Sequence, residues 1–521
     1  MVNFLTCLVK TRAIIRICCV FLFIFFHFAC QKEKYDIIIR QATIYDGSGK
    51  AAFVGDVAIS GDTIAAVGDL GGVVAQNDID GKDLALAPGF IDTHSHHDRF
   101  LFDSPDALAV VNQGITTIIV GQDGGSSSPL KKYLDHLADS PVAVNVGSYS
   151  GHNTIRSLVM GNDFKRKATA DEVHKMEALL QDDLEAGAFG LSTGLEYDPG
   201  IYSDKAEVLS LSKLLAPFNG RYISHLRSED RYFWDALNEI ITIGKVTGVP
   251  VQVSHFKLAM RSLWDKADSA ISILNAARSN GVNITADIYP YPYWSSDIRV
   301  LFPERNFRDL KEAEFVLKEV TTPAGIVFSD FEPSPDYNGK SLEDIARMKN
   351  RSPEQMLIDV IGQLEDCDTK KKDCSGSIVA TSMEEADIGK LMKWKYTNIC
   401  SDGSSKGLHP RGFGAFTRVL ANYVRDTHTL SLEEAINKMT FLSAENVGIE
   451  RRGRITPGFF ADIVLFDAGT VKDNAAITNP QSISSGIENV WVNGVEVFNN
   501  NGTTKRYPGR VILRAKQKTG L

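Results

Sequence analysis

Between residues 89 and 451, short β-branched runs alternate with amphipathic helical patterns, and this alternation limits the possible folds more than any other feature. Each run ends at a small or polar residue. The runs are ITTIIVGQDG, VAVNVGS, FGLSTG, RYISHLRSE, VPVQVSHFK, NITADIYPY, GSIVATS and YTNICSDGS. Segments such as DEVHKMEALLQDDLEAGA and LEEAINKMTF have helical spacing between them. With the strand of PGFIDTHSH, the pattern predicts an α/β protein built on a (β/α)8 TIM barrel.

The two ends of the chain have a different pattern, without alternating helices. Residues 35–88 form short β-rich pieces separated by Gly, Asp and Ser turns, and similar pieces return in residues 452–521 as ADIVLFD, ENVWVNGVEVFNN and YPGRVILRA. We expect both ends to combine into one β domain beside the barrel. Residues from about 296 to 350 are richer in charge, Pro and Gly, and we expect an insertion that caps the barrel mouth.

Histidines gather where the predicted strands end. His94 and His96 are two residues apart and project from the same side of a strand, so they can hold one ion together. Two further runs end in His225 and His255, and a later one ends in Asp402. Imidazole suits Zn²⁺, and an aspartate beside a metal-bound water can accept its proton. Scattered loop histidines would not recur at successive strand ends, so we predict a site for one or two Zn²⁺ ions.

At this point the chain resembles the amidohydrolase superfamily and, within it, the N-acyl-D-amino-acid deacylases (D-aminoacylases). The resemblance covers nearly all of the sequence after the first thirty residues. The motifs that carry it are PGFIDTHSH, GHNTIR, FGLSTGLEYDPG, SHLRSE, VSHFK, ADIYPY, CSDG and the closing RGRITPGFFADIVLFD. The resemblance implies that the β domain is a β-sandwich. It also implies a zinc-dependent hydrolase that cleaves N-acyl-D-amino acids to a carboxylate and a free D-amino acid.

The resemblance assigns roles to the residues at the strand ends. His225 and His255 match the ligands of the more tightly held zinc, and His94 and His96 match those of the second site. Asp402 matches the catalytic base, which would take a proton from the attacking water and return it to the leaving amine. Metal, with His94 or Tyr197, would hold the oxyanion of the tetrahedral intermediate.

One position departs from the family pattern. The deacylases usually present a bridging cysteine in a GNCG stretch, but the matching stretch here is GQDG, which places Asp123 at that position. A carboxylate can also bridge two cations, although it is a harder ligand than a thiolate. We therefore expect Asp123 to be a ligand. Glu196 in GLEYDPG is the rival carboxylate, and it could instead orient ligands or substrate.

The substrate of such an enzyme carries a free carboxylate, which needs a cation and hydroxyl donors. Lys257 lies two residues after His255 and points to the same side. In the resembling family, the positions of Lys257, Tyr197, Tyr289 and Ser295 contact the substrate carboxylate. Ordinary aromatic packing is the alternative for Tyr289.

Other histidines and one arginine have weaker assignments. His152 in GHNTIR and Arg227 in HLRSE are candidates near the pocket without an assigned role, and His97 is expected to support its neighbours. No role is assigned to His136, His174 or His409.

Three other functions remain open at this stage. One is a dipeptidase acting on peptides with a C-terminal D-residue, because such peptides also carry a free carboxylate that Lys257 could bind. Cyclic amides, the substrates of hydantoinase and dihydroorotase relatives, fit the deacylase motifs less well. A non-catalytic binding lipoprotein would not need the complete set of four histidines and Asp402.

Charge and the first thirty residues indicate the partners and the location. The 521 residues include 56 basic and 65 acidic side chains, and the net charge of −9 argues against nucleic acid and favours a small-molecule substrate. Basic residues precede the apolar run IRICCVFLFIFFHFAC, which is typical of a signal peptide. The run ends in Ala29 and Cys30, like the processing site of bacterial lipoproteins, although His27 stands where leucine is usual. We expect an exported protein, periplasmic or tethered to the membrane through lipid on Cys30; plain secretion and an uncleaved anchor are the alternatives.

Few cysteines follow the predicted leader, so the chain is not a disulfide scaffold. Cys367 and Cys374 are close enough in sequence to pair in an oxidising periplasm, and two free thiols are the equal alternative. Cys400 is the third cysteine of the predicted mature chain.

Overall fold

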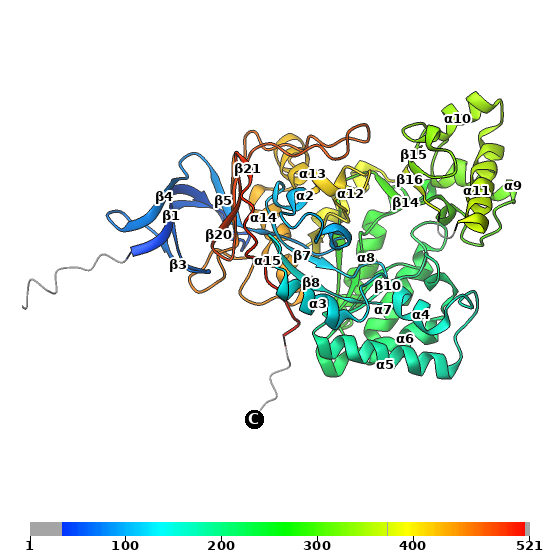
Figure 1. Ribbon diagram of the computed structural model, residues 1–521, viewed down its shortest axis with the longest axis horizontal. Coiled ribbons are helices and arrows are strands. Elements are labelled where there is room, and N and C mark those ends of the chain that lie inside the picture. The colour runs from blue at the N-terminus through cyan, green and yellow to red at the C-terminus, as the bar shows by residue number, and fades with distance from the viewer. Residues whose placement is uncertain (1–33, 372–373, 516–521) are drawn as a thin grey trace, which may run out of the picture.

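The computed structural model describes residues 34–371 and 374–515, and this part of the chain is a mixed α/β structure (Figure 1). The predicted leader, residues 1–30 with Cys30, lies outside the described residues. Among the residues that are described, no helix has both the length and the apolar character needed to cross a membrane.

Strands from both ends of the chain share one sheet. Its nine strands follow the order β21-β20-β19-β18-β5-β1-β2-β3, with β4 paired to β1. The ends meet where β5 and β18 pair antiparallel, with Ala87 opposite Val464. The strands are β1 (Lys34–Ile44), β2 (Phe53–Ser60), β3 (Thr63–Gly68), β4 (Val74–Asp80), β5 (Ala85–Pro88), β18 (Ile463–Phe466), β19 (Ile487–Val492), β20 (Val495–Asn499) and β21 (Gly502–Thr503). Figure 1 shows the blue N-terminal and red C-terminal strands side by side at one end of the molecule.

Parallel strands fill the middle of the chain. One sheet has the order β6-β7-β8 and a second has the order β17-β13-β12-β11-β10-β9, with every pair parallel. Only Tyr149 separates β8 from β9, and a parallel bridge joins Ser95 to Gly403. The strands are β6 (Phe90–Asp92), β7 (Ile115–Val120), β8 (Asn145–Ser148), β9 (Ser150–Gly151), β10 (Gly190–Gly194), β11 (Arg221–His225), β12 (Val251–Val253), β13 (Ile284–Ile288) and β17 (Thr397–Ile399).

Helices connect these parallel strands, and most of them pack against the strands in one hydrophobic core, while α15 packs in a second. The sequence marks their ends: α5 begins at a capping box between Thr169 and Glu172 and ends at Gly187, whose φ of 111° suits glycine. The helices are α2 (Leu108–Val111), α3 (Leu130–Asp139), α4 (His152–Met160), α5 (Ala170–Ala186), α6 (Lys205–Lys213), α7 (Phe233–Thr247), α8 (Ala267–Ser279), α12 (Glu385–Lys393), α13 (Arg411–Arg418), α14 (Leu432–Met439) and α15 (Phe441–Val447).

The segment between β13 and α12 forms a separate unit, at the far end of the molecule from the nine-stranded sheet (Figure 1). Its sheet is antiparallel, in the order β14-β16-β15, and it has its own hydrophobic core. The elements are β14 (Tyr293–Asp297), η5 (Ile298–Leu301), α9 (Leu310–Phe315), η6 (Val316–Val320), β15 (Ile326–Phe331), α10 (Leu342–Lys349), α11 (Pro353–Lys370) and β16 (Gly376–Thr381).

This unit is longer than the insertion of about 296–350 that the sequence suggested. Its central strand, β16, is formed by GSIVAT of the run GSIVATS, which we expected among the barrel strands. That expectation is wrong, because β16 pairs antiparallel with β14 and β15. A short β-branched run has the same pattern in either kind of sheet, so the partner strands decide its place.

A disulfide closes the unit near the end of α11. Cys367 is bonded to Cys374, so of the two alternatives for this pair the structure has the bonded one, while Cys400 is free and buried. Between them, Asp368 accepts hydrogen bonds from Cys374 N at 2.7 Å and from Arg299 Nη1 at 2.5 Å. The disulfide therefore lies in the same contact network as η5.

Candidate metal centre and active site

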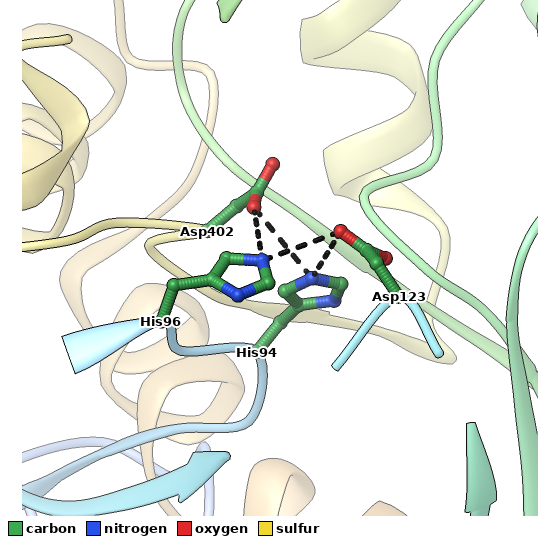
Figure 2. A group of neighbouring side chains, drawn as sticks. All are labelled: His94, His96, Asp123 and Asp402. Carbon is green, nitrogen blue, oxygen red and sulfur yellow. Dashed lines mark hydrogen bonds and ion pairs between the residues drawn. The ribbon is translucent and has the colours of Figure 1, made fainter. Parts of the chain in front are cut away.

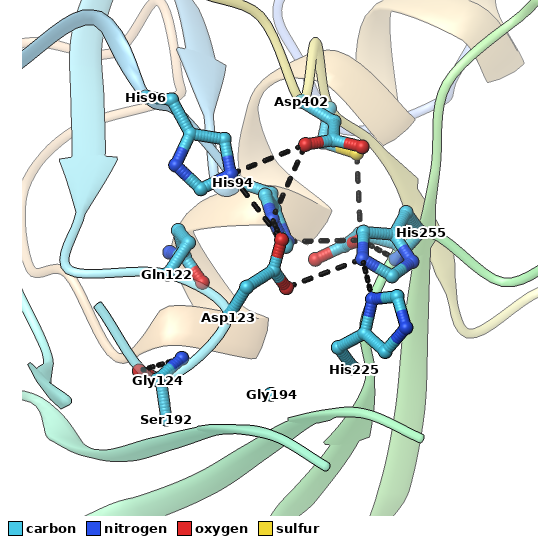
Figure 3. Close-up of polar contacts among 12 residues, drawn as sticks. His94, His96, Gln122, Asp123, Gly124, Ser192, Gly194, His225, His255 and Asp402 are labelled. Carbon is cyan, nitrogen blue, oxygen red and sulfur yellow. Dashed lines mark hydrogen bonds and ion pairs between the residues drawn. The ribbon is translucent and has the colours of Figure 1, made fainter. Parts of the chain in front are cut away.

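Six of the predicted side chains meet at the carboxyl ends of the parallel strands (Figure 3). Each comes from the last residue of a strand or from the turn that follows it, as the sequence pattern predicts for parallel strands. They are His94 and His96 after β6, Asp123 after β7, His225 at the end of β11, His255 after β12 and Asp402 after β17.

One group of ligand atoms lies within 4.8 Å of one another and belongs to His94, His96, Asp123 and Asp402 (Figure 2). Asp123 Oδ2 is 3.3 Å from Nε2 of both histidines. On the other side, Asp402 Oδ1 is 3.3 Å from His96 Nε2 and 3.6 Å from His94 Nε2. Two imidazoles therefore face two carboxylates across a space that could hold one ion.

A second group shares Asp123 and adds His225 and His255. Asp123 Oδ1 is 3.2 Å from His255 Nε2, which lies 3.0 Å from His225 Nδ1. The two oxygens of Asp123 therefore face different histidine pairs, and Figure 3 shows the carboxylate between them. A carboxylate in this position could contribute one oxygen to each of the two ligand groups.

Glu196 lies on the outer side of the second group. Its Oε2 is 2.9 Å from His225 Nε2, and it forms a further possible ligand set with His225 and Glu229. Burial raises the pKa of Glu196, although His225 opposes the rise. Of the two rival carboxylates, Asp123 contacts both histidine pairs and Glu196 contacts His225.

Three of these side chains stand on strained backbone. The φ angles are 51° at Asp123, 35° at His255 and 50° at Asp402, in a region that glycine adopts more readily. Such conformations cost roughly 1–3 kcal/mol each and persist where the surroundings impose them. For Asp402, its backbone N donates to His94 O at 2.8 Å. Strain at three neighbouring polar residues is typical of a functional site.

Hydrogen bonds to β10 and α4 hold the loop that carries Asp123. Ser192 of β10 donates to Gly121 O at 2.5 Å, and Gly124 N donates back to the same hydroxyl at 3.2 Å. At the start of α4, Thr154 N donates to Gly124 O at 3.0 Å. The loop therefore cannot move without breaking hydrogen bonds to β10 and α4.

The charges of the cluster fit a divalent cation. Burial lowers the pKa of His96, but Asp123 and Asp402 outweigh this effect and raise it to about 9. Both ring nitrogens of His94 are buried and have no hydrogen-bond partner among the described residues. Negative potential together with unpaired imidazole nitrogens is the environment that Zn²⁺ needs, and imidazole with carboxylate is a suitable donor set.

Asp402 has the charge state of a base. Burial raises its pKa, but Arg411 and the neighbouring histidines outweigh burial and hold the pKa well below its usual range. Arg411 Nη1 forms an ion pair with Oδ2 at 2.6 Å, which leaves Oδ1 directed at the histidines. The carboxylate is therefore ionised and can accept a proton.

Lys257 is in the site, but it already has an anionic partner. Its Nζ donates to both oxygens of Glu229, at 2.8 and 2.7 Å, and lies 2.7 Å from His255 Nδ1. Burial lowers the pKa of Lys257, and Glu229 outweighs this and raises it, so the ammonium keeps its charge. Lys257 and Glu229 together fix the far side of the His255 ring.

Two adjoining cavities open over the cluster. Tyr197, Ser295, Asp402 and Arg411 line both, and the outer cavity has a volume of about 570 Å³. The inner cavity is also lined by Lys257 and by residues of β14 and η5. The separate unit between β13 and α12 therefore supplies one wall of the site.

Tyr289 is close to the cavities without lining either of those two. Its ring lies 4.9 Å from the Arg411 guanidinium carbon and 5.7 Å from Lys257 Nζ. The hydroxyl is buried and has no hydrogen-bond partner among the described residues. Tyr289 thus packs beneath the two cations.

The structure places His152 and Arg227 in other contacts. His152 Nε2 is 2.8 Å from Glu207, which also pairs with buried Arg156. Arg227 makes a two-point ion pair with Glu239 at 2.9 Å. Neither residue lines the two cavities over the cluster. Both side chains therefore contact buried glutamates and not the candidate metal centre.

Two histidines lie beside the cluster. His97 is buried, burial lowers its pKa to about 3, and its Nδ1 is 3.4 Å from Ser405 Oγ. His409, for which the sequence suggested no role, lines the outer cavity and accepts a hydrogen bond from Arg411 N at 3.0 Å. His409 thereby fixes the start of α13, from which Arg411 reaches Asp402.

Sequence reasoning also missed Glu229, Asp287 and Arg411. Glu229 stands four residues after His225 in the motif SHLRSE, so its place near the ligand could have been inferred. Arg411 and Asp287 have no such local signal, because their partners come from other strands.

Comparison with known proteins agrees with this geometry. A model of the amidohydrolase family matches residues 401–498. The chain is 32% identical to a D-aminoacylase of Alcaligenes xylosoxydans xylosoxydans, over 93% of this chain and 99% of that protein. The chain belongs to the D-aminoacylase family of amidohydrolases. An N-acyl-D-glutamate deacylase of the same organism is 34% identical over 93% of this chain and 98% of its own length.

A solved structure of this D-aminoacylase family is also similar. It is the N-acyl-D-glutamate deacylase of Bordetella bronchiseptica, complexed with zinc and a phosphonate inhibitor that mimics the tetrahedral intermediate. The TM-score is 0.82 at 32% identity, over 93% of this chain and all of that one. The family membership expected from the sequence motifs is confirmed, and with it a metal-dependent amidohydrolase.

The two rival carboxylates are separated by a metal-binding measurement. We expect Asp123→Ala to lower zinc affinity by more than about 100-fold, since losing a direct ligand exceeds the roughly 10–100-fold effect of losing a group that only supports one. We expect Glu196→Ala to lower it by no more than about 10–100-fold, because Glu196 supports the ligand His225. Zinc content and chelator competition measure both variants. The reverse order of the two losses would contradict the assignment of Asp123.

Proposed function

We propose that the protein is a zinc-dependent hydrolase that cleaves the amide bond of N-acyl-D-amino acids and releases a carboxylate and a free D-amino acid. The observation that carries the proposal is the convergence of two histidine pairs on Asp123 beside ionised Asp402. The substrates named for the relatives, N-acyl-D-glutamate among them, support this choice of substrate.

The proposed ligands divide between two ions. His94, His96 and Asp402 surround one position, and His225 and His255 the other, with Asp123 between them. Zinc at these positions would lower the pKa of a water molecule and polarise the acyl carbonyl.

Asp402 performs the proton transfers of the proposed reaction. Its Oδ1 faces the metal positions, and Arg411 holds Oδ2. The carboxylate accepts the proton of the attacking water and returns it to the leaving amine. Tyr197 lines both cavities. Burial is the main reason that its pKa lies well above the usual value, and the nearby carboxylates raise the pKa further. The hydroxyl therefore stays protonated and can donate to the developing oxyanion.

The substrate carboxylate would bind at the wall of the inner cavity. Ser295 and Tyr197 offer hydroxyl donors there, and Lys257 offers positive charge. Glu229 already neutralises part of the charge of Lys257. Arg411 lines the same cavity and offers a second positive charge to the substrate carboxylate. Tyr289 acts by packing against both cations.

The fold that supports this reaction is a (β/α)8 barrel, residues 89–451, with a β-sandwich from residues 35–88 and 452–521. Parallel pairing from β6 to β8 and from β9 to β17 supports the barrel, as does the parallel bridge between Ser95 and Gly403. The nine-stranded sheet built from both ends supports one β domain.

A dipeptidase for peptides with a C-terminal D-residue is the second candidate. The outer cavity of about 570 Å³ has room for a peptidyl group in place of a simple acyl group. Its polar lining, which includes Ser404, Lys406 and Asp297, favours groups that form hydrogen bonds.

We further propose that the protein is exported and tethered to the membrane by lipid on Cys30. The apolar run before Cys30 supports the proposal, and so does the disulfide between Cys367 and Cys374, because disulfides persist in oxidising compartments.

Asp402→Asn tests the proton-transfer role. We expect kcat to fall by roughly 10²–10⁴-fold, because the amide cannot accept the proton of water at neutral pH. Zinc content should change little, since His94, His96 and Asp123 remain at that position. Steady-state kinetics and metal analysis of the same sample check this. A near-normal kcat would show that another group is the base.

A substrate panel tests the reaction and its stereochemistry. We expect zinc-dependent release of amine from N-acetyl-D-amino acids and little from N-acetyl-L-amino acids. Xaa-D-Xaa dipeptides and hydantoins complete the panel, and chelator treatment is the control. Faster cleavage of the dipeptides would favour the dipeptidase. No cleavage of any substrate in the panel, with or without added zinc, would favour a binding protein.

Lipid labelling tests the location. We expect a labelled fatty acid to be incorporated into the wild-type protein in a bacterial host and to be absent from Cys30→Ala, since the thiol is the attachment site. Membrane and soluble fractions of both proteins are compared. An unlabelled wild-type protein released to the soluble fraction would contradict the tether.

A further inference from the structure

Asp287 is a buried carboxylate that the proposed mechanism does not use. It is the last but one residue of β13 and is completely inaccessible to solvent. Within residues 34–371 and 374–515, it has no ion pair with lysine or arginine. A buried carboxylate without a cation is costly, so its persistence calls for a positive or hydrogen-donating partner. The histidines of the candidate metal centre supply that environment.

The first of these contacts is to the backbone of His255. Asp287 Oδ1 accepts a hydrogen bond from His255 N at 2.5 Å. The main-chain oxygen of Asp287 accepts from the next residue, Phe256 N, at 2.7 Å. His255 has the strained φ of 35°. One residue of β13 therefore holds two successive amides and fixes the turn that directs His255 at Asp123.

The second contact is to the ring of His94. Its Nε2 faces Asp123 Oδ2 at 3.3 Å, and its Nδ1 lies 3.8 Å from Asp287 Oδ1. Both nitrogens are buried without a hydrogen-bond partner among the described residues. An imidazole that binds a metal through Nε2 carries its proton on Nδ1. Asp287 is thus on the side of the ring where that proton would lie.

The carboxylate itself is held in place. Gln252 Nε2 donates to Asp287 Oδ2 at 2.6 Å, and Thr285 Oγ1 donates to Gln252 Oε1 at 3.0 Å. These bonds occupy Oδ2 and leave Oδ1 for the two histidines. Oδ1 also accepts a hydrogen bond from Cys400 Sγ at 3.4 Å.

We infer that Asp287 is a positioning residue that fixes two zinc ligands, His255 through its backbone and His94 through its ring. The inference rests on the proposed zinc site. A carboxylate behind a metal-ligating histidine sets the tautomer and raises the basicity of the ring, and its loss typically lowers metal affinity about 10–100-fold.

Asp287→Asn tests the inference, with Asp183→Asn as the matched control. Asp183 is also a buried aspartate, and it accepts from Ser150 Oγ at 2.6 Å and from Leu130 N at 3.2 Å. Zinc affinity is measured by chelator competition, the melting temperature without metal by thermal unfolding, and the ligand field by the visible spectrum of the Co²⁺ form. We expect Asp287→Asn to lose roughly 10–100-fold in zinc affinity with an altered spectrum. Asp183→Asn should keep both.

A double-mutant cycle separates positioning from general destabilisation. If Asp287 acts through His94, its substitution should cost less zinc affinity in a His94→Ala background than in the wild type. If Asp287→Asn does not fold, Gln252→Met releases Oδ2 and should lower zinc affinity several-fold without abolishing folding. Parental zinc affinity in Asp287→Asn, or in Gln252→Met used in its place, would overturn the inference.

The outcomes also distinguish this inference from the proposed function. A wild-type protein that binds zinc but hydrolyses no N-acyl-D-amino acid would overturn the proposed substrate and leave the test of Asp287 intact. A wild-type protein without zinc affinity would overturn both.

Discussion

Hydrogen bonds between residues 92–96 and 401–403 are the contact on which the rest of the site depends. Ser401 Oγ donates to Asp92 at 2.5 Å, Asp402 N donates to His94 O at 2.8 Å, and His96 N donates to Gly403 O at 2.9 Å. Asp92 and Ser401 are 309 positions apart in the chain. This pairing brings Asp402, the proposed base, to the first histidine pair, where its backbone has a positive φ of 50°.

Buried lysine and arginine side chains determine which carboxylate oxygens of the site remain free to face the histidines. Arg411 occupies one oxygen of Asp402, and Lys257 occupies both of Glu229. Asp123 has no ion pair with lysine or arginine in the described part of the chain, so both of its oxygens face imidazoles. The distribution of positive charge thus distinguishes the three carboxylates: Asp402 is the proposed base, Glu229 is the partner of Lys257, and Asp123 is the proposed bridge.

The sequence predicted the strand-end residues because parallel strands place their carboxyl ends together, whatever their separation in the chain. It could not predict ion-pair partners, since a buried charge takes the opposite charge that the fold brings near it. The motif SHLRSE places Glu229 near His225, but it does not indicate that Glu229 pairs with Lys257, and no local pattern pairs Arg227 with Glu239. The run 376–381 was assigned to the wrong sheet because β-branched alternation does not report strand direction. Asp287 was missed for a related reason: its role depends on two neighbours from other strands.

Asp123 stands where the family usually has a bridging cysteine, so the proposed bridge between the two metal positions is a carboxylate and not a thiolate. A thiolate presents a single sulfur, which must contact both cations at once. The carboxylate presents two oxygens, and here Oδ2 faces His94 and His96 while Oδ1 faces His255. Each oxygen could therefore hold one cation, and the carboxylate would give a harder ligand field than a thiolate. Softer cations lose more from this exchange than Zn²⁺ does, because their affinity depends more on sulfur. We therefore expect the aspartate to keep the connection between the two histidine pairs and to shift the metal preference towards borderline and harder ions.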